Sequence, residues 1–122
     1  MFATTIRYPL PTGTDWEVFR QLLVRRAFDT YRFVPGLRSV ALVLSPERGE
    51  VGGNFVWETQ DDAEAFLRSD AFRATLAQLG EPSVLERGEI GAYIEDGDLL
   101  FPPDYDARTA GSSDASAQPL GS

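Results

Sequence analysis

Hydrophobic periodicity switches repeatedly along this chain, and the order of the switches constrains the fold more than any other feature. Apolar stretches rich in β-branched and aromatic residues predict strands, and apolar positions spaced by three and four predict helices. The segments predicted in this way are strands over residues 2–8, 37–44, 51–58 and 84–95, and helices over residues 14–33 and 59–79. The predicted order of elements is therefore β-α-β-β-α-β.

Local signals support the ends of both predicted helices. Thr14 and Glu17 have the spacing of a capping box, with Thr14 as the N-cap residue of the first helix. Thr59 is a second N-cap signature, and Gly80 is a typical residue after the end of a helix. The second helical stretch contains a break near Ser69. Each helix boundary is thus marked by its own residues as well as by periodicity.

The order of elements predicts an α+β protein with a ferredoxin-like fold, in which two helices cover one face of a four-stranded antiparallel sheet. Neither face of the last predicted strand is uniformly polar, so the other side of the sheet needs a partner. We expect that partner to be a second copy, packed sheet on sheet in a dimeric α/β barrel. Residues 1–103 are expected to form this domain with a C-terminal extension, whose residues 97–103 have no assigned role. Residues 104–122, small and polar, are expected to form a disordered tail.

Composition excludes several kinds of catalytic site. The 122 residues include no His, no Cys and no Lys, and all 11 basic residues are arginine. The chain therefore has no thiolate nucleophile, imidazole base, Cys/His zinc site, haem-binding His or Schiff-base lysine. We expect neither a resident metal nor a cofactor. Any chemistry has to rest on Arg, Tyr, Trp, Asn and carboxylates around a reactive substrate.

The acidic balance of the chain bears on its partners. The formal net charge of −8 argues against binding to nucleic acid or to an anionic membrane surface. No apolar run reaches the length of a transmembrane helix, and the first residues do not resemble a signal peptide. We therefore expect a cytoplasmic protein whose partners are a small apolar or aromatic molecule and a second copy of the chain.

Several short motifs resemble one family of known proteins. The chain is similar to the YdhR-like monooxygenase-type proteins of the dimeric α/β-barrel superfamily, which are related to antibiotic-biosynthesis monooxygenases and polyketide cyclases. The resemblance covers residues 2–95 and implies a homodimer with a pocket between sheet and helices in each subunit. It also implies cofactor-free oxidation of phenolic or enolic substrates, although isomerases, cyclases and ligand binders share the fold. The matching residues are Pro35-Gly36-Leu37, Val51-Gly52-Gly53, Phe55, Trp57, Ala63, Ala65, Phe66, Leu67 and Leu79-Gly80.

Arg26 is the candidate cation of the site. It falls inside the apolar arc of the first predicted helix, close to Phe19. A guanidinium in such a position either extends outward to solvent or an ion pair, or it meets an anion such as a substrate enolate or phenolate. Both alternatives remain open from sequence alone.

Trp57 is a candidate catalytic residue because the resemblance implies a pocket Trp near the end of the third strand. The equal alternative is that a Trp on a strand is simply a core residue. Related quinone-forming enzymes pair this Trp with an Asn four residues earlier, where this chain has Gly53. Asn54 is one residue further on and belongs to the opposite face of the strand. A bulge at Gly52–Gly53 would bring Asn54 to the Trp57 side.

The candidate site residues divide into two groups. The candidate catalytic residues are Arg26, Trp57, Asn54 and Tyr93. The candidate substrate-binding residues are Trp16, Phe19, Tyr8, Tyr31, Arg38 and Phe55. Tyr31 also belongs to a second apolar group on the first helix, with Val24 and Phe28, which we expect to contact the C-terminal segment or a partner subunit.

These residues predict a cofactor-independent, monooxygenase-like tailoring enzyme that acts on an aromatic or polyketide-type enolisable substrate in secondary metabolism. The alternatives are a non-redox polyketide cyclase or isomerase on the same fold, and a non-catalytic dimer that binds a small molecule. A cavity of several hundred Å³ between sheet and helices, reached by polar side chains, would favour an enzyme.

Overall fold

The computed structural model describes residues 1–100. The predicted disordered tail at residues 104–122 and the end of the predicted extension at 101–103 lie outside this range. The chain divides into two compact units, Met1–Glu89 and the residues that follow from Ile90. Each unit is described by itself.

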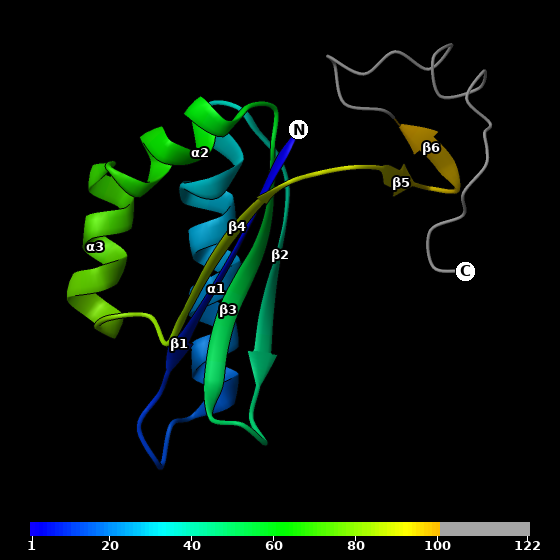
Figure 1. The fold of residues 1–122 in the computed structure, drawn as a ribbon. Helices are drawn as coiled ribbons and strands as arrows, with labels where there is room; N and C mark the ends of the chain where they lie inside the picture. Colours follow the sequence, from blue (N-terminus) through cyan, green and yellow to red (C-terminus); the bar gives the residue numbers. More distant parts are fainter. Residues whose placement is uncertain (101–122) are drawn as a thin grey trace, which may run out of the picture. The chain divides into compact units, whose positions relative to one another are not determined.

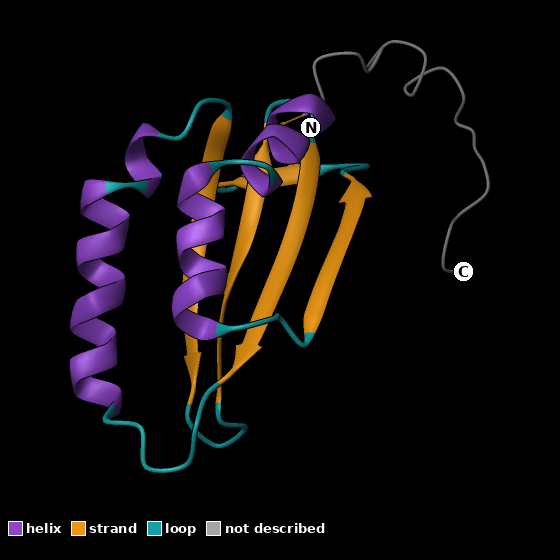
Figure 2. Ribbon diagram, turned by 90° about the vertical axis from the view of Figure 1, so that its left-hand side faces the viewer, coloured by secondary structure: helices purple, strands orange, loops and turns teal. Residues whose placement is uncertain are grey.

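The first unit is a sheet with helices on one face (Figures 1 and 2). Its four strands run in the order β2-β3-β1-β4, and every neighbouring pair is antiparallel. The predicted ferredoxin-like fold is therefore confirmed. The elements are β1 (Phe2–Pro9), α1 (Trp16–Asp29), the 3₁₀ turn η1 (Tyr31–Phe33), β2 (Leu37–Ser45), β3 (Glu50–Trp57), α2 (Gln60–Leu67), α3 (Asp70–Leu79) and β4 (Val84–Glu89).

Alternate residues of the strands form an aromatic core against the helices. Trp57 is completely buried, and its Nε1 donates a hydrogen bond of 3.0 Å to Oγ1 of the buried Thr4. The Trp57 ring stacks on Phe55, with centroids 5.9 Å apart, and contacts Phe66 of α2 at 5.4 Å. Because Trp57 has both its apolar surface and its indole N–H satisfied, it anchors the helices on the sheet.

The helix ends follow the predicted signals with one correction. Asp15, and not Thr14, is the N-cap of α1, because its carboxylate accepts hydrogen bonds from two backbone N–H groups of the first turn. The Thr14 hydroxyl donates instead to the Pro11 carbonyl. Thr59 caps α2 as predicted, and the predicted break separates α2 from α3, which is capped by Ser69.

The first helix ends earlier than predicted. It stops at Asp29, and residues Tyr31–Phe33 form the 3₁₀ turn η1. This change of direction buries Tyr31, whereas Val24 and Phe28 remain exposed. The predicted grouping of Tyr31 with Val24 and Phe28 is therefore wrong, because it assumed a continuous helix through residue 33.

The last strand of the sheet is also shorter than predicted. Glu89 pairs with Phe2, which is the first residue of β1, so β4 has no further partner residues beyond this point. The second unit contains a separate hairpin of β5 (Tyr93–Glu95) and β6 (Asp98–Leu100). Its turn has positive φ at Asp96 and Gly97, as in a tight two-residue hairpin turn.

Candidate functional site

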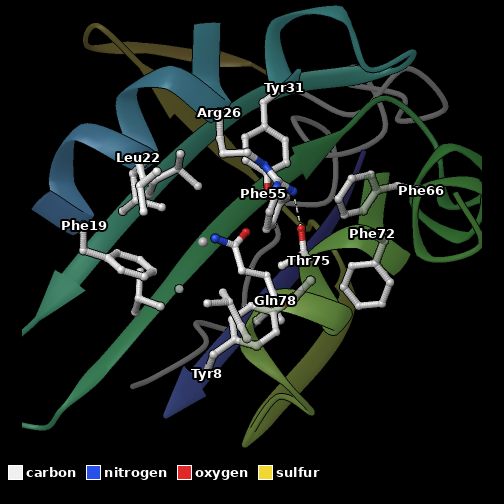
Figure 3. Close-up of a pocket in the computed structure, with 17 residues that line it drawn as sticks. Tyr8, Phe19, Leu22, Arg26, Tyr31, Phe55, Phe66, Phe72, Thr75 and Gln78 are labelled. Carbon is white, nitrogen blue, oxygen red and sulfur yellow. Dashed lines mark hydrogen bonds between the residues drawn. The ribbon is translucent and has the colours of Figure 1, made fainter. Parts of the chain in front are cut away.

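A small cavity lies between α1, α3 and the helix-covered face of the sheet (Figure 3). Its volume is about 50 Å³, well below the several hundred Å³ that would favour an enzyme. Most of the lining is apolar, and the polar side chains that reach it are Tyr8, Arg26, Tyr31, Thr75 and Gln78. The cavity therefore combines an apolar wall with a few polar groups, which is the composition of a small-molecule site, at a much smaller size.

The periodicity of two helices brings these side chains to the cavity. Phe19, Leu23 and Arg26 follow the three-and-four spacing of one face of α1, and Phe72 and Thr75 do the same on α3. On the sheet, Gly53 keeps the wall of the cavity open. A Cβ at Gly53 would lie 2.7 Å from Cε1 of Phe55, so only glycine leaves room for that ring.

The Arg26 side chain turns inward toward α3 (Figure 3). Its Nη2 donates hydrogen bonds to Oγ1 of Thr75 and to the carbonyl oxygen of Ala71, the latter at 3.4 Å. Its guanidinium carbon lies 5.9 Å from the centre of the Tyr31 ring. Its Nε is buried and has no hydrogen-bond partner.

Within residues 1–100, Arg26 forms no ion pair with a carboxylate. A buried N–H is ordinarily hydrogen-bonded. Arg26 is half-buried as a residue, and its buried Nε–H lacks such a bond. Arg26 therefore carries a positive charge with protein hydrogen bonds from Nη2 and no carboxylate partner among residues 1–100.

Tyr8 supplies a protonated hydroxyl to the same cavity. Burial raises the pKa of Tyr8 to about 12, and the neighbouring Tyr31 and Glu81 also raise it, while the positive charge of Arg26 lowers it. Tyr8 therefore keeps its proton at neutral pH. It is suited to donating a hydrogen bond to an anion, and unsuited to acting as a general base.

The described residues that line the cavity include no Asp or Glu. A bound anion would meet no competing carboxylate there, and an acidic substrate would find no carboxylate base. Residues 1–100 also contain no group of three acidic side chains placed to hold a metal ion. The arrangement can bind and stabilise a negative oxygen, and it leaves proton removal to the acidity of the ligand itself.

The structure brings half of the predicted site residues together and leaves the others elsewhere. The predicted residues that line the cavity are Tyr8, Phe19, Arg26, Tyr31 and Phe55. The predicted residues that do not line it are Trp16, Arg38, Asn54, Trp57 and Tyr93.

Asn54 and Trp57 lie on opposite faces of β3. The pairing of β3 with both neighbouring strands is continuous through Gly52 and Gly53, so the bulge that would have turned Asn54 inward is absent there. Asn54 is exposed and accepts a hydrogen bond from the Thr5 hydroxyl at 3.3 Å. Trp57 lies in the core behind Phe55, and the geometry leaves both residues out of the cavity.

Of the other three residues, Trp16 and Arg38 belong to the first unit and do not line the cavity. Trp16 is the first residue of α1 and is half-buried. Arg38 pairs with Glu58 at 3.1 Å, near a bulge at the start of β2. Tyr93 belongs to β5, in the second unit.

Thr75 and Gln78 are the cavity residues that the sequence interpretation missed. Thr75 is buried and falls on the apolar stripe of α3 with Phe72 and Leu79. A polar residue on an apolar stripe was the signal that could have revealed it. Gln78 is exposed at the rim, and its amide points toward the middle of the cavity residues (Figure 3).

Comparison with known proteins gives structural matches only. No protein-family model matches the chain, and no curated protein matches it. A putative antibiotic biosynthesis monooxygenase from Deinococcus radiodurans superposes with a TM-score of 0.56 and 20% identity, over 78% of this chain and 97% of that one. A protein of unknown function from Nitrosomonas europaea superposes with a TM-score of 0.62 and 17% identity, over 77% and 92%.

A second putative antibiotic biosynthesis monooxygenase, from Chloroflexus aurantiacus, has a TM-score of 0.53 and 13% identity, over 75% of this chain and 95% of that one. The chain therefore has the ferredoxin-like fold that these proteins share, as the sequence resemblance implied. At such low identities the similarity concerns the fold alone. Within residues 1–100, no helix is long and apolar enough to cross a membrane.

Proposed function

We propose that this protein is a small cofactor-independent, monooxygenase-like enzyme that binds a flat phenolic or enolisable substrate as its anion beneath α1. The observation that carries the proposal is the environment of Arg26. This residue places a cation in a cavity that is otherwise mostly apolar, without a carboxylate partner among the described residues and with an unpartnered Nε. The fold shared with putative antibiotic biosynthesis monooxygenases supports the same class of activity.

Each cavity residue has a role in this proposal. Arg26 holds the negative oxygen of the substrate, and Tyr8 donates a second hydrogen bond to it. Phe19 and Phe55 pack against the apolar body of the substrate. Because the lining contains no carboxylate, the substrate has to be acidic enough to ionise when Arg26 stabilises its anion.

The proposed reaction consumes molecular oxygen. The ionised substrate forms a bond from its activated CH₂ carbon to one atom of O₂, and the O–O bond then breaks. One oxygen atom remains as a new carbonyl group, and the other leaves as water with the two hydrogens of the CH₂ group. The substrate loses two electron pairs and O₂ accepts them, so no further reductant is required.

The size of the cavity implies that its rim moves when substrate binds. An engineered cavity of about 150 Å³ holds benzene, whereas this cavity measures about 50 Å³. Leu22 and Gln78 line the cavity with exposed side chains, so they can rotate outward without unpacking the core. We expect these two residues to open the site to a substrate ring.

A homodimer belongs to the same proposal. In the first unit, the face of the sheet opposite the helices has no covering helix (Figure 2), and the strand register gives it mostly small or polar side chains. Packing of two such faces would enclose them without disturbing the cavity, which lies on the other side of the sheet. Light scattering on the purified chain tests this point directly, since a mass of one chain would contradict it.

A second candidate function is the non-catalytic binding of a small anion. The small volume of the cavity and its lack of a carboxylate base favour this alternative. Cyclisation or isomerisation would start from the same substrate anion, and the fold shared with putative antibiotic biosynthesis monooxygenases is what favours oxygenation over these reactions.

The test compares Arg26→Met with a control, Arg25→Met. The control removes the same charge from the exposed residue that directly precedes Arg26 in α1. The readouts are calorimetric binding of a phenolate probe and the incorporation of labelled O₂ into an anthrone, a flat enolisable ketone. We expect Arg26→Met to weaken probe binding and oxygenation by tenfold or more, because a charge-assisted hydrogen bond is lost. Arg25→Met should change neither.

Two outcomes decide between the candidates. Binding that depends on Arg26, without incorporation of label, would replace the oxygenase by the anion-binding protein. Equal binding by both variants would contradict any role of Arg26 in holding an anion.

A further inference from the structure

The guanidinium of Arg26 is held from α3 through one of its three nitrogens. Nη2 carries two hydrogens, and both are directed to protein acceptors, Oγ1 of Thr75 and the carbonyl oxygen of Ala71. The Thr75 hydroxyl in turn donates to the same Ala71 carbonyl at 3.1 Å. Since Thr75 is buried, this arrangement is shielded from competing water.

Because Nη2 donates to protein acceptors, Arg26 has fewer pairs of N–H donors left for a ligand. A guanidinium presents two pairs of parallel N–H groups, one formed by Nε with Nη2 and the other by Nη1 with Nη2. Carboxylates and phosphates are bound most strongly when two of their oxygens accept from such a pair. Because both pairs include Nη2, neither is complete for a ligand while Thr75 and Ala71 occupy that nitrogen.

Resting on the proposed function, we infer that the site selects a ligand with a single negative oxygen, a phenolate or an enolate, over a carboxylate or a phosphate. Thr75 is the positioning residue that sets this selection. It leaves Arg26 with separate single donors, among them the buried Nε, which has no partner.

The other groups of the cavity fit the same ligand class. The protonated hydroxyl of Tyr8 donates one further hydrogen bond, which also suits a single oxygen. The largely apolar lining penalises a ligand that brings several charged oxygens into the cavity, because each of them would need its own donors. A delocalised phenolate or enolate brings one strong acceptor and a flat apolar body.

The test measures the affinity of two probes of equal ring size, 4-nitrophenolate and 4-nitrobenzoate, by calorimetry at a pH at which both are ionised. We expect the full-length chain to bind the phenolate about tenfold more tightly or better. Thr75→Val keeps the shape of the side chain and removes one of the two acceptors of Nη2, so one N–H of Nη2 becomes available, the carboxylate should gain affinity and the ratio should fall several-fold. Thr75→Ser keeps the hydroxyl and should restore the ratio.

A second readout does not depend on any variant. The Nε–H resonance of Arg26 in the nuclear magnetic resonance spectrum of the unmodified chain should move strongly downfield with the phenolate, and much less with the carboxylate. A merely structural role of Thr75 would change stability and leave the ratio of affinities unchanged.

The outcomes separate this inference from the proposal on which it rests. Equal affinity for the two probes, or a ratio that Thr75→Val does not change, would overturn the selection while leaving anion binding intact. If neither probe bound and the Nε–H resonance did not respond, the proposed anion site itself would be wrong.

Discussion

The two faces of the sheet are built from the same four strands and differ in almost every property. On β3, Phe55 and Trp57 point toward the helices and are buried, whereas Asn54 and Val56 point to the other side. The helix-covered face holds the aromatic core and the cavity. The uncovered face carries mostly small or polar side chains, namely Ala3, Thr5, Arg7, Gly52, Asn54, Val56, Val84, Glu86 and Gly88.

The difference shows on which face an unpartnered polar group is unusual. On the uncovered face, polar side chains are ordinary, because water or a partner can satisfy them. On the covered face, the indole of Trp57 is satisfied by Thr4, and the Nε of Arg26 is the one buried side-chain polar atom without a partner among the described residues. In a core that otherwise satisfies its polar groups, this unsatisfied donor is the observation on which the proposed anion site rests.

The largest expected effect is a difference in stability between variants of two adjacent residues, one on each face of the sheet. Trp57→Ala should lower the free energy of unfolding by about 3–5 kcal/mol, because it removes a completely buried ring and leaves a cavity. Val56→Ala on the other face should cost about 1 kcal/mol or less. Chemical denaturation of both variants measures the difference.

A comparable loss from the two variants would mean that the uncovered face is packed as tightly as the core. In that case the midpoint for Val56→Ala should depend on protein concentration, since a second copy would be the covering surface. The experiment thus sharpens the contrast between the faces as well as testing it.

The contrast between the faces could be predicted from the sequence, because the alternation of side chains along a strand depends only on neighbouring residues. The order of the elements and the inward position of Phe55 follow from it. The end of β4 was not accessible, since it depends on where β1 begins, more than eighty residues earlier in the chain. The burial of Tyr31 was missed for a related reason: it depends on the early end of α1 at Asp29.

The candidate site could be predicted on its α1 side and on the sheet, and not on its α3 side. The position of Arg26 on an apolar arc is a local property of one helix, and it marked the residue correctly as unusual. The partner of Arg26, Thr75, lies 49 residues further along the chain. Periodicity within α1 contains no information about which residue of another helix faces it, so the Thr75 contact required the structure.

The next largest effect concerns pH, and it belongs to the covered face. The pKa of Tyr8 is raised from 10.0 to about 12, so between these values the folded chain keeps a proton that the unfolded chain has lost. Stability should therefore be unaffected by Tyr8 below about pH 10 and should fall as pH rises toward 12, by roughly 2 kcal/mol. Tyr8→Phe has no such proton and should show a smaller decrease over the same range in pH-dependent denaturation.

Equal pH dependence for Tyr8→Phe and the unmodified chain would show that the hydroxyl is as well solvated as an exposed one. It would also remove the reason to regard Tyr8 as a donor that stays protonated beside a bound anion.

The smallest expected effect lies on the uncovered face. Asn54→Ala removes an exposed hydrogen bond of 3.3 Å to the Thr5 hydroxyl, and both groups can bond to water instead. The free energy of unfolding should change by no more than about 0.5 kcal/mol, and anion binding in the cavity should not change. A loss of binding with unchanged stability would mean that Asn54 reaches a ligand through the partner subunit or another conformation. Because the covered face alone provides the Arg26 donors, a null effect of Asn54→Ala together with a large effect of Arg26→Met would place the chemistry on that face and leave the other to assembly.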